Sequence, residues 1–121
     1  MIRRVPSYFS HSDDRGSIHG IINFGTWEEV NFVTSASGTV RGNHYHKYTR
    51  EAFLILEGEI NIVTKSMKTS EKSVDEEVVK QGDFFIIEPF TLHTFKIIKD
   101  SKWLNLLSHK MSDIDKDFYR E

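Results

Sequence analysis

Two histidines spaced two residues apart, with a glutamate five residues further on, are the feature that limits most strongly how this chain can fold. Side chains alternate between the two faces of a strand, so His44 and His46 would leave the same face of extended chain. Glu51 has the opposite parity, and it can join them only if the backbone turns or bulges within residues 47–50. The pattern predicts two imidazoles and a carboxylate gathered around an irregular turn.

Short β-favouring runs separated by turn residues make up most of the sequence. Turn signals recur roughly every 8 to 12 residues, as in a sandwich or barrel, and no long segment has the apolar period of a helix. The length of 121 residues suits a single domain. We therefore predict one all-β domain with an N-terminal arm over 1–15, a β-barrel over 16–109 and a C-terminal tail over 110–121. A Ser-x-x-Asp pattern in the tail favours a single turn or a short helix.

Two details of the strand pattern lead to further expectations. Glu57-Gly58 separates the apolar run 52–56 from the run 59–65, which predicts a hairpin with a glycine turn. Residues 92–98 and 103–107 are expected to form two separate strands. Both faces of residues 52–56 are apolar, so this strand needs an outer cover as well as the interior of its own fold. A second subunit is the economical cover, and we expect a homodimer.

Composition excludes several classes of protein. The chain has no cysteine, which removes disulfides, thiolate metal sites and thiol nucleophiles. Its net charge of −2 comes from intermixed signs without the basic stripe of a nucleic-acid binder, so we expect no nucleic-acid partner. No stretch approaches the length of a membrane span and the N-terminus lacks a secretory signal. A cytoplasmic protein without membrane contact is the expectation.

The segment from Gly38 to Gly58 reads G-x5-H-x-H-x4-E-x6-G. At every fixed position it matches the first motif of the cupin superfamily, which the chain resembles. The second cupin motif has a looser counterpart in GDFFIIEPFTLH, where His93 is the histidine of that motif. Glu88 and Phe90 stand where the family usually has proline and glycine, which bears on the turn before His93. The resemblance implies a jelly-roll β-barrel, commonly dimeric.

The resemblance also implies a metal inside the barrel, with His44, His46, Glu51 and His93 as its ligands. Three imidazoles and one carboxylate suit Zn²⁺, Fe²⁺, Mn²⁺, Ni²⁺, Co²⁺ or Cu²⁺ and leave positions open for water or substrate. An open metal site of this kind can catalyse reactions. The alternative is that these histidines are solvated or hydrogen-bonded residues of ordinary strands.

A narrower likeness is carried by the strings RGNHYHK at 41–47, DDRG at 13–16 and DFYR at 117–120. They are similar to cupins that process sugars for surface polysaccharides, namely nucleotide-sugar ketoisomerases and the metal-binding cupin domains of capsule-synthesis reductases. The ketoisomerases work without metal, use the histidines as acid and base, and typically carry glutamine at the position of Glu51. The glutamate found here therefore favours a metal.

These observations predict a metal-binding cupin that isomerises or epimerises a sugar or nucleotide-sugar next to a carbonyl. His93 or a metal-bound hydroxide is the candidate base, and His44 and His46 are further candidate catalytic residues. Arg41 is a candidate clamp for a phosphate or carboxylate, or else a surface ion-pair residue. Tyr48 and Phe95 are further candidate substrate contacts. An Fe-dependent dioxygenase and a non-catalytic sugar- or metabolite-binding protein are the two alternatives.

Overall fold

The computed structural model describes residues 2–70 and 73–121. Nine β-strands and the loops between them account for these residues, which include no helix and therefore none long and apolar enough to cross a membrane. The all-β prediction is confirmed. The strands are β1 Arg3–Arg4, β2 Phe9–Asp13, β3 Gly16–Gly20, β4 Glu29–Ser35, β5 Val40–His44, β6 Glu51–Ser66, β7 Val74–Lys80, β8 Phe84–Ile87 and β9 Thr91–Leu107.

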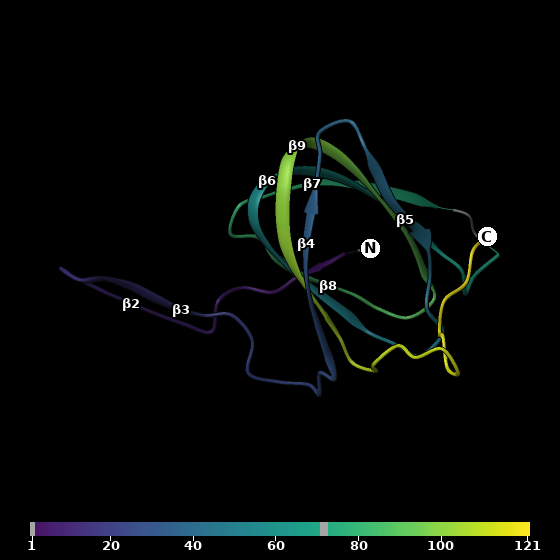
Figure 1. Cartoon of the computed structure of the whole chain (residues 1–121), viewed down its shortest axis with the longest axis horizontal. Coiled ribbons are helices and arrows are strands. Elements are labelled where there is room, and N and C mark those ends of the chain that lie inside the picture. The colour runs from purple at the N-terminus through teal and green to yellow at the C-terminus, as the bar shows by residue number, and fades with distance from the viewer. Residues whose placement is uncertain (1, 71–72) are drawn as a thin grey trace.

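Two long antiparallel strands, β6 and β9, form the centre of the fold. Strands β7 and β8 pair with β6, β4 and β5 pair with β9, and β1 continues the sheet beyond β8. The resulting seven-stranded sheet curls around an interior (Figure 1). Every strand of this sheet is therefore placed, directly or through β8, by one of the two long strands.

Aromatic side chains fill much of the interior. The ring of Phe53 stacks on that of Phe85 with their centroids 5.2 Å apart, and it also lies 5.1 Å from Phe95. Phe95 in turn lies 5.5 Å from Trp103. Isoleucine and valine side chains of β6, β7, β8 and β9 complete this cluster. The core thus supports the inner face of both long strands.

The hairpin predicted at Glu57-Gly58 is wrong. β6 runs without interruption from Glu51 to Ser66, and its register against β9 shifts on both sides of Glu57. Gly58 has a φ of +105°, and a Cβ there would lie 2.6 Å from the carbonyl oxygen of Asp100. The glycine marks a bulge that bends a continuous strand, which in sequence gives the same signal as a turn. β9 is likewise one strand where two were expected.

The two ends of the chain also differ from expectation. Arg3 and Arg4 pair with β8, and β2 forms a hairpin with β3 that projects from the body of the molecule (Figure 1). Strands therefore make up part of the predicted arm, and the projecting hairpin continues through β3 to Gly20, past the predicted boundary at residue 16. Residues 110–121, all of them described, contain no helix or helical turn. Hydrogen bonds to the barrel hold this tail instead, because Tyr119 pairs with Tyr45 as an isolated bridge.

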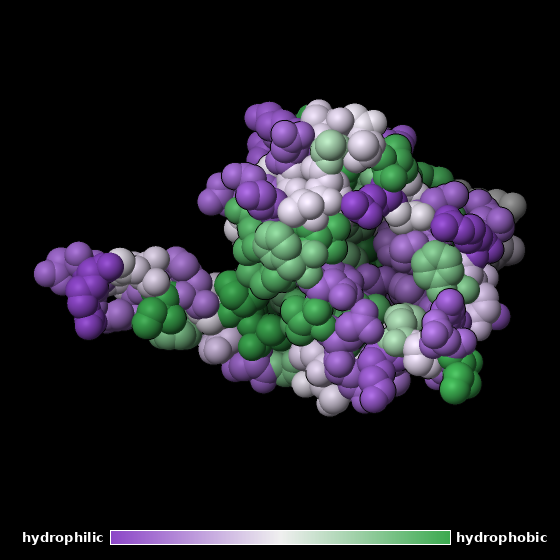
Figure 2. Space-filling model, viewed as in Figure 1, coloured by the Kyte–Doolittle hydropathy of each residue, from purple (hydrophilic) through white to green (hydrophobic). Residues whose placement is uncertain are grey.

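The outer face of the sheet carries an apolar surface. Val30 and Phe32 point outward from β4 and are each 61% exposed. They pair with Leu106 and Leu104 of β9, which are partly buried. Figure 2 shows apolar residues gathered on this side of the body, next to the base of the projecting hairpin.

Candidate metal centre

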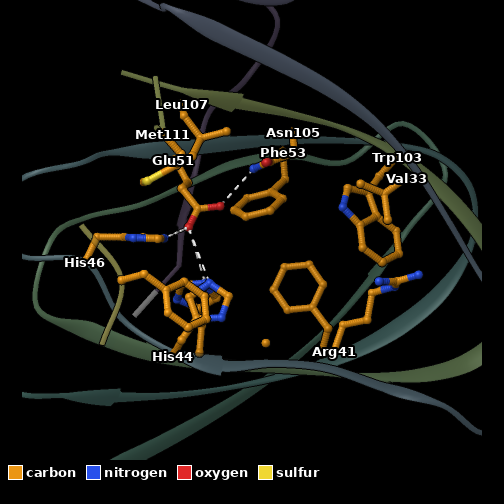
Figure 3. A pocket seen from close by; sticks show the side chains of 14 residues that line it. Val33, Arg41, His44, His46, Glu51, Phe53, Trp103, Asn105, Leu107 and Met111 are labelled. Carbon is orange, nitrogen blue, oxygen red and sulfur yellow. Dashed lines mark hydrogen bonds and ion pairs between the residues drawn. The ribbon is translucent and has the colours of Figure 1, made fainter. Parts of the chain in front are cut away.

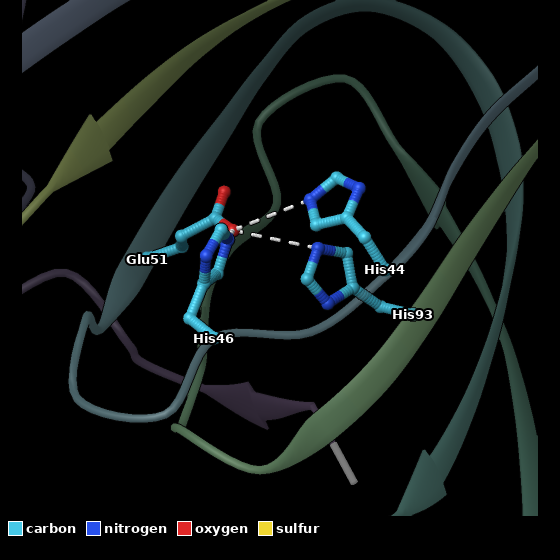
Figure 4. A group of neighbouring side chains, drawn as sticks. All are labelled: His44, His46, Glu51 and His93. Atoms are coloured by element: carbon cyan, nitrogen blue, oxygen red, sulfur yellow. Dashed lines mark hydrogen bonds and ion pairs between the residues drawn. The ribbon is translucent and has the colours of Figure 1, made fainter. Parts of the chain in front are cut away.

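Four polar side chains meet inside the barrel. His44 ends β5, His46 follows two residues later, Glu51 begins β6 and His93 lies near the start of β9. One ligand atom from each residue lies within 4.8 Å of those from the other three (Figure 4). Nε2 of His93 lies 3.4 Å from Oε1 of Glu51, and Nε2 of His44 lies 3.9 Å from the same oxygen. Nε2 of His46 makes a short contact with the same oxygen.

Irregular backbone brings these residues together. The register of β5 against β9 shifts between Gly42 and His44, and Gly42 and Asn43 have φ values of +92° and +61°. A Cβ at Gly42 would lie 2.7 Å from the carbonyl oxygen of His93, so glycine permits this close approach. Residues 47–50 then leave the strand conformation, as the parity of Glu51 requires. Phe90, at the position where the resemblance predicts glycine, also has a φ of +61°, which lies in the region that favours glycine.

Backbone carbonyls orient the imidazole rings. Nδ1 of His93 donates to the carbonyl oxygen of Thr91 at 3.0 Å, and Nδ1 of His46 donates to the carbonyl oxygen of Asp117. The ring of His44 is hydrogen-bonded to the backbone of Gly42. A carbonyl only accepts hydrogen bonds, so Nδ1 of His46 and of His93 carries a proton and Nε2 faces Glu51.

The electrostatics of the cluster favour an ionised Glu51 beside a neutral His44. Burial and the charge of His93 lower the pKa of His44 to about 4. Burial alone would raise the pKa of Glu51, but hydrogen bonds from His46 and His93 bring that pKa well below its usual range. Burial lowers the pKa of His46, but its contacts with Glu51 and Asp117 together outweigh burial, so the net shift is upward. At neutral pH Glu51 is ionised and His44 is neutral.

The donor set fits a divalent transition metal. Imidazole nitrogens and carboxylate oxygens are ligands for zinc and for its first-row neighbours. Hydrogen bonds on the far side of the ligands, which fix their orientation, are typical of metal sites. Glu51 has such a partner in Asn105, whose Nδ2 donates to Oε2 at 2.8 Å and leaves Oε1 facing the three rings. The sequence-predicted ligands His44, His46, Glu51 and His93 are thus brought together.

A cavity of about 270 Å³ opens beside the cluster. The histidines and Glu51 lie at one end, whereas Val33, Arg41 and Trp103 lie at the other (Figure 3). Phe95 forms part of the apolar wall and Phe118 lies near the histidines. The cavity therefore combines an apolar wall with polar groups at both ends.

The three predicted substrate contacts lie in different places. Arg41 lines the cavity and donates from Nε to Ser35 Oγ and from Nη2 to the carbonyl oxygen of Thr34. Phe95 also lines it. Tyr48 lies outside the cavity, where its hydroxyl group bonds Asp115, because the turn over residues 47–50 directs this side chain outward. Its position does not support the predicted role.

Three residues of the site were missed in the sequence. Asn105 is a polar residue between Trp103 and Leu107 on the inward face of β9, and that isolated polarity is a signal that could have identified it. Asp117 and Phe118 belong to the DFYR string, but their role depends on a contact with residues about 70 positions earlier. Nothing in the local sequence shows that contact.

Comparison with known proteins agrees with this architecture. Residues 11–111 match a family model described as the polysaccharide biosynthesis C-terminal domain. A search of curated proteins found no match.

Similar solved structures include three sugar-related proteins. A 3,4-ketoisomerase from Helicobacter canadensis is 14% identical with a TM-score of 0.75, and the match covers 95% of this chain and 87% of that one. The dTDP-4-dehydrorhamnose 3,5-epimerase of Sulfolobus tokodaii is 19% identical with a TM-score of 0.73, and the match covers 87% of this chain and 69% of that one. The capsular polysaccharide assembling protein CapF of Staphylococcus aureus is 22% identical with a TM-score of 0.70. The match covers 93% of this chain but only 33% of CapF, so this chain spans a third of that protein. These similarities confirm the cupin jelly-roll fold.

Proposed function

Because the chain belongs to the family of polysaccharide biosynthesis C-terminal domains, we propose that it is a metal-binding enzyme that isomerises or epimerises a sugar or nucleotide-sugar. The observation that carries this proposal is the convergence of three imidazoles and one carboxylate at one end of a cavity. The names of two similar structures, a 3,5-epimerase and a 3,4-ketoisomerase, support the sugar class and the reaction type.

The volume of the cavity limits the size of the substrate that can enter it. Small-molecule sites usually enclose about 300–1,000 Å³, and this cavity of about 270 Å³ is just below that range. It suits one sugar ring better than a complete nucleotide-sugar. A nucleotide part would therefore remain at the mouth of the barrel while the sugar reaches the histidines.

The three most buried members of the cluster are the proposed core of the metal site. The side chains of His46 and Glu51 are each 6% exposed and that of His93 is 3% exposed, against 19% for His44. Catalytic zinc sites commonly use three protein ligands and keep a position open. A metal bound there would polarise a substrate carbonyl and stabilise the negative charge that develops on its oxygen.

Proton transfer is assigned to His44, the fourth predicted ligand. Its pKa of about 4 leaves the ring neutral and able to accept a proton at neutral pH. It is also the histidine of the cluster most open to the cavity. Removing a proton from the carbon next to a carbonyl requires such a base. This moves the role predicted for His93 to His44 and leaves His93 as a ligand.

His44→Ala and His46→Ala should separate these roles. We expect His46→Ala to lose metal in plasma mass spectrometry because it removes a buried ligand, whereas His44→Ala should retain metal and lose turnover. Turnover is measured in D₂O by NMR as exchange of the proton next to the carbonyl, over a panel of keto-sugar nucleotides. His19→Ala, at an exposed position of β3 far from the cluster, is the control.

Three other outcomes would contradict part of this proposal or favour a different function. A wild-type protein that stays metal-free after incubation with each candidate metal contradicts the metal part of the proposal. Oxygen uptake by the iron form would favour the dioxygenase. Thermal stabilisation by a sugar nucleotide without any exchange would favour a non-catalytic binding protein.

We also propose that the protein is a homodimer, with the apolar outer face of β4 and β9 covered by a second copy. The hairpin of β2 and β3 supports this occupant. Its register puts Phe9 and Ile18 on one face, and an isolated two-stranded hairpin is only marginally stable in water. The hairpin projects from its own body, and a two-fold symmetric partner would offer each copy the apolar face that the other needs.

Phe32→Asp should shift the protein from dimer to monomer at micromolar concentration in light scattering coupled to size exclusion. An ionised carboxylate placed in an apolar interface stays unpaired there, which is costly. Val74→Asp introduces the same charge at a similarly exposed position of β7, and it should remain dimeric. A wild-type protein that is monomeric under these conditions contradicts the proposal.

The cytoplasmic location stays a prediction.

A further inference from the structure

The C-terminal tail supplies a strand-like partner to the segment that carries two histidines. Beyond His44 this segment leaves the sheet, and Tyr45 pairs with the tail. The backbone N–H of Tyr45 donates to the carbonyl oxygen of Tyr119 at 2.9 Å, and the reciprocal bond measures 3.0 Å. Arg120 donates to the carbonyl oxygens of Gly42 and Asn43 at 3.3 and 3.2 Å. The tail is therefore fastened on both sides of His44.

Asp117 makes the most complete contact between the tail and the turn. Its carboxylate accepts backbone N–H bonds from Lys47 at 2.8 Å, Tyr48 at 2.9 Å and Thr49 at 2.8 Å. The residue is 1% exposed. A carboxylate that accepts three backbone N–H groups holds those peptide units in one arrangement. The turn between His46 and Glu51 is thus fixed by a residue of the tail.

The same residue reaches His46 through its main chain. The carbonyl oxygen of Asp117 accepts the Nδ1 proton of His46, as described above. The neighbouring residue Phe118 places its ring centroid 4.4 Å from that of His44. One short stretch of the tail therefore contacts both histidines of the H-x-H pair, and at His46 it does so through the ring nitrogen opposite the one that faces Glu51.

We infer that Asp117 is a positioning residue for the metal site. Its carboxylate fixes the turn over residues 47–49, and this places its own carbonyl oxygen against Nδ1 of His46, which presents Nε2 of that ring to the metal. The inference rests on the proposed function, because it assigns Asp117 a role in the site proposed there.

Asp117→Ala keeps the backbone carbonyl that His46 contacts but releases the turn over residues 47–49 that positions this carbonyl. It should therefore weaken Zn²⁺ binding by up to roughly 10- to 100-fold, the usual range for disturbing an outer hydrogen bond of a ligand. Affinity is measured by competition with a chromogenic chelator. Asp117→Asn should show a smaller loss, because its amide oxygen can still accept the bonds from Tyr48 and Thr49. Asp113→Ala is the matched control, since its carboxylate is fully exposed in the same tail and contacts only Lys116 among the ion pairs described.

A second readout does not need the metal. In proton–nitrogen NMR spectra of the apo protein, the Nδ1 proton of His46 should exchange slowly with water in the wild type and in Asp113→Ala. It should exchange fast in Asp117→Ala. A wild-type protein that binds no zinc would defeat the proposed function while this exchange still tests the inference.

Unchanged zinc affinity together with unchanged exchange in Asp117→Ala would overturn the inference. If Asp117→Ala does not fold, the same two measurements are made on Asp117→Asn. Zinc affinity and proton exchange equal to those of the wild type would overturn the inference. Weaker zinc binding with faster exchange would support it.

Discussion

Glu51→Gln should bind Zn²⁺ more than about 100-fold more weakly than the wild type, a larger loss than that of an outer hydrogen-bond partner. Glutamine keeps the size of the side chain and can still pair with Asn105. It lacks the negative charge toward which the three Nε2 atoms of the cluster converge. The chelator competition used for the tail variants measures the loss.

Glu57→Gln provides the matched control for this substitution. Glu57 lies in the same strand, its side chain is 60% exposed, and its ion pair with Lys102 spans 3.8 Å. Exposed pairs of this kind contribute little, so zinc affinity should be unchanged. Equal affinities for Glu51→Gln and the wild type would show that zinc binds elsewhere. In that case the cluster would have to act as a metal-free acid and base.

Phe85→Ala should lower the free energy of unfolding by about 3–5 kcal/mol, the usual range for truncating a buried phenylalanine. The side chain is fully buried and stacks on Phe53. Phe95 forms a triangle with these two rings, with its centroid 6.4 Å from that of Phe85 and 5.1 Å from that of Phe53. The neighbouring rings therefore cannot fill the space without moving. Typical domains have only about 5–15 kcal/mol of stability in total. Urea denaturation followed by tryptophan fluorescence measures the change.

Val78→Ala is the comparison for this core variant. Val78 lies on β7 and is substantially exposed, so its truncation should change stability by no more than about 0.5 kcal/mol. A loss below about 1 kcal/mol for Phe85→Ala would mean that the aromatic cluster repacks around the missing ring.

The cluster of three histidines and a glutamate could be predicted from the sequence because most of its members lie close together in the chain. His44, His46 and Glu51 lie within eight consecutive residues, and their parity alone required the turn that the structure contains. His93 followed from the looser second motif. The orienting contacts of Asn105 and Asp117 join residues 54 and 71 positions from their partners, which no local pattern encodes.

The errors in the strand pattern have a similar cause. A glycine after an apolar run can belong either to a hairpin turn or to a bulge within one continuous strand. Which of the two forms depends on the strand that pairs with this segment. At Gly58 the partner is β9, which continues past the bulge. The strand Phe9–Asp13 was missed because serine, histidine and aspartate have little β preference. It forms through pairing with β3 across the turn at residues 14–15.

The contact of Asp117 has a consequence for how the protein is made. During vectorial synthesis His44, His46, Glu51 and His93 all leave the ribosome before Asp117 does. A nascent chain can therefore pair β6 with β9 while the turn over residues 47–49 still lacks the carboxylate that holds it. The cluster reaches its final arrangement only after the tail has emerged, so binding of the proposed metal would be among the last steps of maturation and would not initiate folding of the barrel.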